Sequence, residues 1–393
     1  EYGTPLYVYS QTCLEQQYVS LKTAMADVNP LICYSVKANS NANVLRTFIE
    51  KGSGMDVVSG GELFRALKAG ADPSKIVFAG VGKRIDEIKY ALEKGILFFT
   101  VESEPEVERI QAVAAEMGKE ADIAIRVNPD VDAGTHHYTS TGKKENKFGV
   151  EFDAVRRIAD RIVELPNMRM VGLHVHIGSQ ILSPEPFMSS LRKIRPLCLE
   201  MKESLPHFEY IDIGGGIGIK YEPKHEPLSY ESFAQGVMPI LKEIGLKVVL
   251  EPGRSLVGNS GALLCRVQYV KKGSTKQFVV VDAGMNDLIR PSLYGAYQEI
   301  VAANDIDGTI RADVVGPICE SGDFLAKDRG LPAVREGDVL AVMGAGAYGF
   351  TMASTYNSRT LPAEVMVRGS SHKLIRRRQS IEELIAPEIM VNL

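Results

Sequence analysis

The chain has 393 residues, of which 45% are hydrophobic and 24% charged, a composition typical of a soluble globular protein of two or three domains. Its formal net charge of −4, from 45 basic and 49 acidic residues, argues against a surface specialised for nucleic acids or anionic membranes. No apolar stretch reaches the roughly 18–20 residues of a membrane span, and the N-terminal segment lacks a signal-peptide pattern. The five cysteines are odd in number and show no C-x-x-C spacing, so we expect reduced thiols and a cytoplasmic location.

Strand-like and helix-like segments alternate regularly from residue 31 to residue 251. We predict strands at 31–36, 54–58, 76–80, 97–101, 122–128, 169–176, 208–213 and 247–251. The stretches 106–117 and 153–165 have the 3.6-residue period of amphipathic helices. In the second of these, one apolar stripe contains Val155, Ile158, Ala159, Ile162 and Val163.

Eight strand–helix repeats in about 220 residues match the size of an α/β fold of the (β/α)8 TIM-barrel type. A doubly wound sheet is the alternative fold. It would be favoured by a G-x-G-x-x-G turn after the first strand, and the sequence has no such turn there.

The pattern of apolar residues changes after Gly253. Alternating apolar runs at 262–270, 277–282 and 362–368 indicate strands separated by glycine and proline turns. The segment Leu6–Tyr9 is also strand-like. We therefore predict a barrel domain over 13–258, followed by a mainly β C-terminal domain over 259–393 that also includes residues 1–12.

Lys37 stands where the first predicted barrel strand stops, in the run YSVKAN at 34–39. The catalytic groups of such barrels lie at the C-terminal ends of the strands. An amine at the rim of an apolar core is partly desolvated, which lowers its pKa and favours attack on a carbonyl group. A lysine that caps a strand and reaches into solvent is the alternative reading of this residue alone.

Other strand ends carry further polar groups. Asp56 and Ser59 mark the second strand, Arg126 and Asn128 the fifth, and His174 and His176 the sixth. After the seventh strand comes a glycine run at 214–218, whose backbone N–H groups could cradle an anion ahead of a helix N-terminus. Ser179 and Arg254 could add a hydroxyl and a charged donor to that anion. A tight turn is the alternative for the glycines.

The two histidines at the sixth strand are two residues apart, so we expect them to face the same side. That spacing would also suit a metal ion, as in barrel hydrolases, which keeps a metal-dependent hydrolase open as a function. We favour His176 lying flat on a cofactor ring, because the other histidines do not fall at strand ends.

Glu251 ends the eighth predicted strand. A cofactor that absorbs electrons through a protonated pyridine nitrogen needs a carboxylate beside that nitrogen. A lysine for the aldehyde, a glutamate for the ring nitrogen and glycines for the phosphate together match pyridoxal 5′-phosphate.

Motifs along nearly the whole chain resemble, in order, the diaminopimelate decarboxylases of the barrel-type (fold III) pyridoxal-phosphate decarboxylases, which include the ornithine and arginine decarboxylases. They are YSVKAN at 34–39, SGGEL at 59–63, RVNPD at 126–130, STGKKENKFG at 140–149, HVHIGSQ at 174–180, GGGIGI at 214–219, EPGR at 251–254, RPSLYGAY at 290–297, CESGD at 319–323 and GAYG at 346–349.

The resemblance implies a role for each matching residue. Lys37 would hold the cofactor covalently, His176 would stack on its ring and Glu251 would contact its ring nitrogen. The phosphate would lie against Ser179, Gly216 and Arg254. The remaining cofactor-binding residues would be Asp56, Arg126, Gly215, Gly253 and Tyr348.

The resemblance also implies a homodimer with shared active sites, in which Cys319 and Glu320 enter the partner's site. Cys319 would be the acid that protonates the product. The implied reaction converts meso-2,6-diaminopimelate to L-lysine and CO2, the last step of lysine biosynthesis. The substrate's second amino acid group needs a carboxylate binder, which Arg254, Arg290 and Tyr294 would supply, with Tyr348 nearby and Glu320 for the distal ammonium.

The sequence leaves two alternative functions open. The enzyme could decarboxylate another basic amino acid or a carboxylated polyamine, such as ornithine, arginine or carboxynorspermidine. A non-catalytic protein that carries the cofactor is a further alternative, although it would not need the β domain that bears Cys319 and Tyr348.

Overall fold

A computed structural model describes residues 1–132 and 147–391 of the chain. These residues form two compact units. The barrel unit comprises Glu15–Ile219 and Pro227–Leu256, and the β unit comprises Glu1–Leu14, Lys220–Glu226 and Val257–Leu393. The short segment Lys220–Glu226 was not predicted to belong to the β unit.

Eight parallel strands close into a barrel in the order of the sequence. They are β2 (Leu31–Ser35), β3 (Gly54–Val57), β4 (Ile76–Phe78), β5 (Phe98–Val101), β6 (Ala121–Arg126), β7 (Met168–His174), β8 (Tyr210–Asp212) and β9 (Lys247–Leu250). The last strand pairs with the first, with Leu31 opposite Val249, so the ring has no free edge. All eight predicted strands are present, with ends shifted by one or two residues, and the predicted TIM-type barrel is confirmed.

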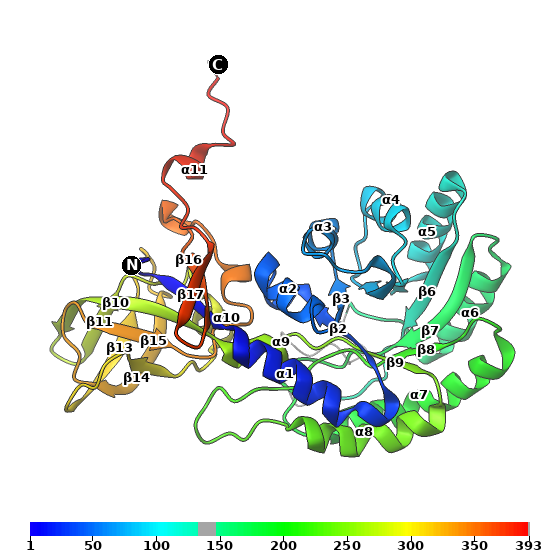
Figure 1. Cartoon of the computed structure of the whole chain (residues 1–393), viewed down its shortest axis with the longest axis horizontal. Coiled ribbons are helices and arrows are strands. Elements are labelled where there is room, and N and C mark those ends of the chain that lie inside the picture. Colours follow the sequence, from blue (N-terminus) through cyan, green and yellow to red (C-terminus); the bar gives the residue numbers. More distant parts are fainter. Residues whose placement is uncertain (133–146, 392–393) are drawn as a thin grey trace. The chain divides into compact units, whose positions relative to one another are not determined.

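Helices surround this barrel on the outside (Figure 1). They are α2 (Ala42–Ile49), α3 (Gly60–Lys68), α4 (Ile85–Lys94), α5 (Glu104–Met117), α6 (Phe152–Glu164), α7 (Glu185–Ser204) and α8 (Tyr230–Ile244), while α1 (Gln11–Ala24) precedes the first barrel strand. The stripe predicted for α6 is buried except for Val163, which is 59% exposed. Val163 is exposed because, at 100° per residue, its side chain lies at the edge of the stripe, whose centre is near Val155 and Ile162. Across the described residues, no helix combines the length and apolar character that a membrane crossing requires.

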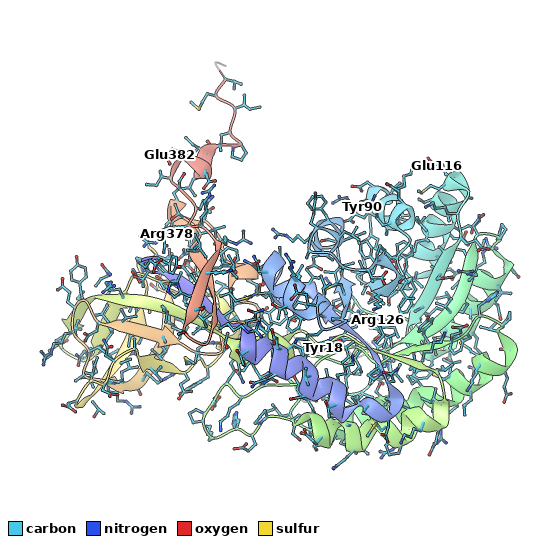
Figure 2. All side chains as sticks on the ribbon, viewed as in Figure 1. Tyr18, Tyr90, Glu116, Arg126, Arg378 and Glu382 are labelled. Atoms are coloured by element: carbon cyan, nitrogen blue, oxygen red, sulfur yellow. The ribbon has the colours of Figure 1, made fainter. Side chains whose placement is uncertain are left out.

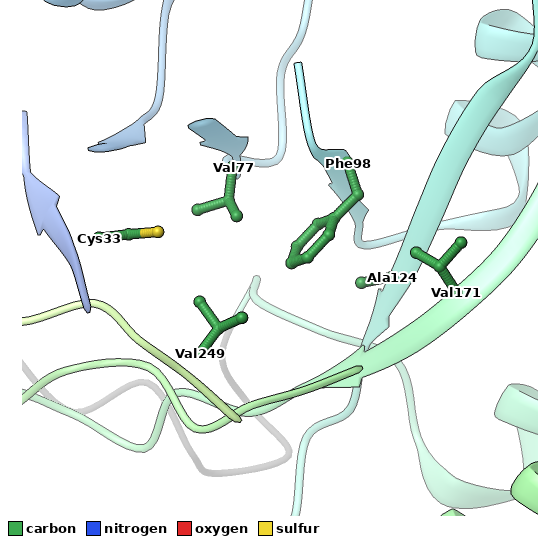
Figure 3. Packing of buried hydrophobic residues seen from close by; sticks show 6 residues of the cluster. All are labelled: Cys33, Val77, Phe98, Ala124, Val171 and Val249. Carbon is green, nitrogen blue, oxygen red and sulfur yellow. The ribbon is translucent and has the colours of Figure 1, made fainter. Parts of the chain in front are cut away.

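A layer of apolar side chains fills the barrel interior (Figure 3). It consists of Cys33, Val77, Phe98, Ala124, Val171 and Val249, all 6% exposed or less. Side chains two residues apart on a strand point to the same face. Ser35 therefore lies one layer above Cys33, and Glu251 one layer above Val249, toward the C-terminal ends of the strands.

The β unit is built on a nine-stranded sheet. Its strands are β1 (Leu6–Ser10), β10 (Gly261–Lys272), β11 (Gln277–Val281), β12 (Ile300–Ala302), β13 (Thr309–Val315), β14 (Phe324–Pro332), β15 (Val339–Val342), β16 (Ala363–Arg368) and β17 (Ser371–Arg376). The N-terminal strand β1 lies between β10, which is antiparallel to it, and β16, which is parallel. The prediction that the N-terminal strand completes the β-rich domain is thus confirmed. Short helices α10 (Arg290–Tyr294) and α11 (Glu382–Ile385) complete the unit, and α9 (Arg254–Val257) leads into it.

Candidate active site at the carboxyl ends of the barrel strands

Lys37 lies on a short 3-10 turn, Val36–Ala38, that directly follows β2. Its Nζ donates a 2.6 Å hydrogen bond to Oδ2 of Asp56, the residue predicted to mark the second barrel strand. The Lys37 side chain is 37% exposed, whereas Asp56 is fully buried. The Ser35 hydroxyl donates to the same carboxylate oxygen at 2.7 Å. The amine is therefore fixed at the rim of the barrel by a buried carboxylate.

Glu251 follows β9 and is 5% exposed. Its Oε2 lies 3.1 Å from Nε2 of His174, at the end of β7. Its Oε1 is buried and has no hydrogen-bond partner among the described residues. A buried carboxylate oxygen without a donor is costly, so this atom marks a position that a ligand donor would stabilise.

The surroundings of Glu251 favour its ionised form. Burial alone would raise the pKa of this carboxyl, but the charge and hydrogen bond of His174, together with the Lys37 ammonium, hold it below its usual range. Glu251 therefore offers a negative charge to a cationic group opposite its free oxygen.

The glycine run after β8 lets three strand ends approach closely. A Cβ atom on Gly215 would lie 2.1 Å from the carbonyl oxygen of Glu251. One on Gly216, whose φ is +110°, would lie 2.3 Å from the carbonyl oxygen of Gly178. Glycine is required at both positions because any side chain would collide with backbone.

The prediction that this run stands ahead of a helix N-terminus was wrong. The next helix, α8, begins only at Tyr230, after an intervening loop. The polar groups beside the run come instead from the loop after β7 and from the start of α9, which follows β9. Nη2 of Arg254 donates to the Ser179 hydroxyl at 3.0 Å, Arg254 is 8% exposed, and the buried Gly253 precedes it. This corner combines backbone amides, a hydroxyl and a guanidinium, the donors that an oxyanion requires.

His176 lies in the loop after β7, and its Nδ1 accepts a 3.2 Å hydrogen bond from the Gly215 N–H. Burial, Arg126 and Lys37 lower the pKa of this imidazole well below its usual value. His176 is therefore a neutral, partly exposed ring at the rim, which suits contact with another flat ring.

Arg126 ends β6, and Figure 2 shows it within the barrel unit. Its Nη1 pairs at 3.2 Å with Glu102, which also accepts the Gly149 N–H at 3.0 Å. Its guanidinium lies 4.6 Å from the Phe148 ring centroid and its Nη2 donates to the His176 carbonyl at 3.5 Å. Arg126 thus supports the loop that carries His176. Of the predicted motif at 140–149, residues 140–146 lie outside the described residues.

One group of three described residues offers metal-type ligand atoms within 4.8 Å of one another, namely His174, Asp212 and Glu251. The group contains His174 but not His176, because β7 ends at His174 and its alternation does not continue. The hydrogen bond between His174 and Glu251 instead indicates a cluster that shares protons.

Ser35, Glu102 and Asp212 were not among the predicted site residues. Glu102 directly follows β5 and Asp212 ends β8, so the strand-end rule that selected Lys37 and Glu251 would have found them.

The remaining predicted residues, Arg290, Tyr294, Cys319, Glu320 and Tyr348, belong to the β unit. Arg290 begins α10, hydrogen-bonds Gln298 through Nη1, and stacks 4.4 Å from the Tyr221 ring centroid. Cys319 is exposed, and its backbone N–H is held by Asn357 Oδ1 at 2.8 Å.

Tyr348 has a φ of +56°, which is uncommon for a bulky residue. Such backbone conformations concentrate at functional sites.

Residues 12–258 match the pyridoxal binding domain of the pyridoxal-dependent decarboxylase family. Diaminopimelate decarboxylase of Neisseria meningitidis serogroup B is 48% identical over 389 residues, covering 99% of this chain and 94% of the relative. The diaminopimelate decarboxylase of Pseudomonas aeruginosa is 48% identical over 391 residues, again covering 99% of this chain and 94% of the relative.

Solved structures that are similar to this chain include further diaminopimelate decarboxylases. Diaminopimelate decarboxylase from Helicobacter pylori, complexed with L-lysine, superposes with a TM-score of 0.95 at 42% identity and covers 98% of this chain and 97% of that one. The enzyme from M. jannaschii with L-lysine gives 0.95 at 35% identity, covering 99% and 93%. A lysine/ornithine decarboxylase from Vibrio vulnificus, at 22% identity and a TM-score of 0.82 over 94% of this chain and 95% of that one, shares the fold.

We predict that Glu62 makes the stability of the barrel depend on pH. Burial raises the pKa of this carboxyl to about 7, although the Val58 N–H donates to it at 2.9 Å. Because the folded state then holds a proton that the unfolded state loses near pH 4.5, stability falls as the pH rises from about 4.5 to 7, by at most about 3 kcal/mol. Glu62→Gln should flatten this slope in melting temperatures measured from pH 5 to 8.

Glu50→Gln is the matched control, because Glu50 is 56% exposed on its side chain. Its melting curves should follow the wild-type pH dependence. An unchanged slope in Glu62→Gln would contradict the assignment.

Proposed function

The chain belongs to the pyridoxal-dependent decarboxylases, in the diaminopimelate decarboxylase family, and from this we propose that it converts meso-2,6-diaminopimelate to L-lysine and CO2 with pyridoxal 5′-phosphate. The observation that carries the proposal is the 48% identity to a named diaminopimelate decarboxylase over 99% of the chain. Such a carboxy-lyase needs an electron-accepting cofactor, an amine that binds the aldehyde of that cofactor, and a proton donor.

The residues at the strand ends suit this cofactor. The buried Glu251 Oε1 without a partner is where a protonated ring nitrogen would be stabilised. Lys37 would bind the aldehyde, and the corner at Ser179, Gly216 and Arg254 would bind the phosphate. When bound, the cofactor draws electrons from the carbon that loses CO2.

The chain's own groups then have defined tasks. Asp56 orients the Lys37 amine through the 2.6 Å hydrogen bond and balances its charge. His176 supplies a neutral face for the ring, held by the Gly215 N–H. Cys319 Sγ–H, from the β unit, delivers a proton to the carbon left by CO2.

Substrate choice rests on the distal end of diaminopimelate, which carries both an ammonium and a carboxylate. Arg254, Arg290 and Tyr294 bind that carboxylate, because planar guanidinium groups match its two oxygens. Glu320 binds the distal ammonium. Substrates with a cationic tail alone lack the group that the arginines recognise.

We further propose a homodimer, located in the cytoplasm, in which Cys319 and Glu320 of each protomer complete the site of the other. The exposure of both residues supports this arrangement, because a residue used across an interface must first be reachable from outside.

The proposal is tested by measuring CO2 release from diaminopimelate, lysine, ornithine and arginine side by side. Release from diaminopimelate alone is expected, and a preference for another amino acid would overturn the substrate assignment. Borohydride treatment of the loaded enzyme should fix the cofactor mass on the peptide that contains Lys37. Metal analysis of the purified protein separates this function from a barrel hydrolase, which would carry stoichiometric metal.

Cys319→Ala should lower kcat by about 10²–10⁴-fold while cofactor binding stays unchanged, because only proton delivery is lost. The measurement is steady-state turnover together with cofactor absorbance after gel filtration. Cys13→Ala is the control thiol. An undiminished rate would remove Cys319 from the role of acid.

Arg290→Ala should raise KM for diaminopimelate by roughly 10–100-fold, the value of one charge-assisted bidentate contact, with a much smaller change in cofactor affinity. Melting temperatures are recorded in parallel, since Arg290 also stacks on Tyr221. Arg311→Ala, at a residue in the same unit whose side chain is 70% exposed, is the control. Equal losses of substrate and cofactor affinity would contradict a role at the substrate's distal end.

A further inference from the structure

Three buried acidic side chains lie at the C-terminal ends of the barrel strands β3, β8 and β9. Asp56, Asp212 and Glu251 are all 5% exposed or less. Three ionised carboxylates in one buried cluster would repel one another strongly, because the low dielectric strengthens the interaction between like charges. Each carboxylate therefore needs either a cationic partner or a proton.

Two of the three carboxylates have strong donors. Asp56 accepts from Lys37 Nζ at 2.6 Å and from Ser35 at 2.7 Å. Glu251 pairs with His174 Nε2 at 3.1 Å.

Asp212 differs from the other two. Among the described residues, its Oδ1 accepts only the Gly214 backbone N–H, at 2.8 Å. Its Oδ2 is buried, and no donor in the described part of the chain reaches it. Asp212 is therefore the acid of this cluster that we expect to keep its proton, because a buried carboxylate without donors is costly.

The neighbours of Asp212 indicate where that proton points. Ligand-type atoms of Asp212, Glu251 and His174 lie within 4.8 Å of one another. Two buried carboxyl groups this close favour a proton on one of them, because two carboxylates offer acceptors only and repel each other.

We propose that Asp212 is a neutral carboxylic acid in the folded protein, which donates its proton to Glu251 and, with His174, positions Glu251 as the ionised partner of the cofactor's ring nitrogen. Asp212 and His174 are thus positioning residues that act through Glu251. The part about the ring nitrogen rests on the proposed function, whereas the protonation of Asp212 does not.

Burial and the charge of Glu251 raise the pKa of Asp56 as well, but the Lys37 ammonium and the hydrogen bonds from Lys37 and Ser35 oppose that shift. The titration behaviour of the other two acids supports the division. Burial raises the pKa of Asp212 well above its usual value, and the charges of Glu251 and Asp56 add to the effect. The pKa of Glu251 is displaced the other way, chiefly by His174 and Lys37. A pair of carboxyls whose pKa values are driven apart has one acid and one base. The other titratable group close by is Cys33 on β2, whose burial raises its thiol pKa so that it stays neutral.

The first test uses the cofactor-free protein and infrared spectroscopy. At pH 8, above the pKa of about 7 of Glu62 and Asp287, a carbonyl band of a protonated carboxylic acid should persist in the wild type. Asp212→Asn should remove this band. Absence of any acid band in the wild type at pH 8, or its survival in Asp212→Asn, would overturn the proposal. If the variant does not fold, the wild-type spectrum at pH 8 still decides whether a buried acid keeps its proton.

The second test uses the loaded enzyme and the nitrogen-15 chemical shift of a cofactor labelled in its ring nitrogen. Asparagine can donate to Glu251 and accept from Gly214 as a neutral aspartic acid does. Asp212→Asn should therefore keep the ring nitrogen protonated, with cofactor affinity within about twofold of wild type. Asp212→Leu should weaken cofactor binding by roughly tenfold or more, because Glu251 loses a hydrogen bond.

Glu251→Gln is the reference in which ring-nitrogen protonation is lost. If Asp212→Asn behaves like Glu251→Gln, Asp212 acts as a carboxylate and the proposal is wrong. If no variant and no wild-type protein binds the cofactor while the infrared band is present, the proposed function fails and the neutral Asp212 stands.

Discussion

Closure of the barrel between β2 and β9 is the constraint on which the candidate site depends. Residues more than two hundred positions apart become neighbours at this seam. The Ser35 N–H donates to the Pro252 carbonyl at 3.1 Å, and the Ser35 hydroxyl donates to the Glu251 carbonyl at 2.9 Å and to Asp56 at 2.7 Å. One small polar side chain thereby ties together the strands that carry the amine and the carboxylate. Because every strand of the closed sheet is paired, the strand ends hold fixed positions relative to one another.

The candidate site also depends on a nearby partner for each buried charge. The barrel unit holds several buried acids, and each described case has its own solution. Glu106 pairs with the buried Lys83 at 2.7 Å, and Glu102 pairs with Arg126 at 3.2 Å. Both pairs are complete without a ligand. The strand-end acids Asp56, Asp212 and Glu251 are different, because each has one oxygen without a donor among the described residues. Glu251 combines such an oxygen with surroundings that keep the carboxyl ionised, which suits a cationic ligand.

Much of the fold could be predicted from the sequence, because the relevant signals are local and repeated. Short apolar strands and 3.6-period helices alternate eight times, and this count predicts a barrel even though strand ends shift by one or two residues. The β unit was predicted from two-residue alternation, including the distant strand β1. The contribution of Lys220–Glu226 to that unit could not be predicted, because this loop has no periodicity and its place is decided by tertiary contacts such as Tyr221 against Arg290.

The site could be predicted where a strand-end position coincides with a reactive side chain. Lys37 and Glu251 were predicted in this way, whereas Asp212, which also meets the condition, was missed because the glycines that follow it gave a stronger signal. Those glycines were read as a phosphate cradle at a helix N-terminus, yet no helix begins there. The structure gives them a steric role first, because a Cβ atom on Gly215 or Gly216 would lie only 2.1 Å or 2.3 Å from a backbone carbonyl oxygen. The same close approach brings the Gly215 N–H to His176 and the Gly214 N–H to Asp212. The glycine run therefore positions a neutral ring and a buried acid, and it would do so whether or not an anion were bound beside it.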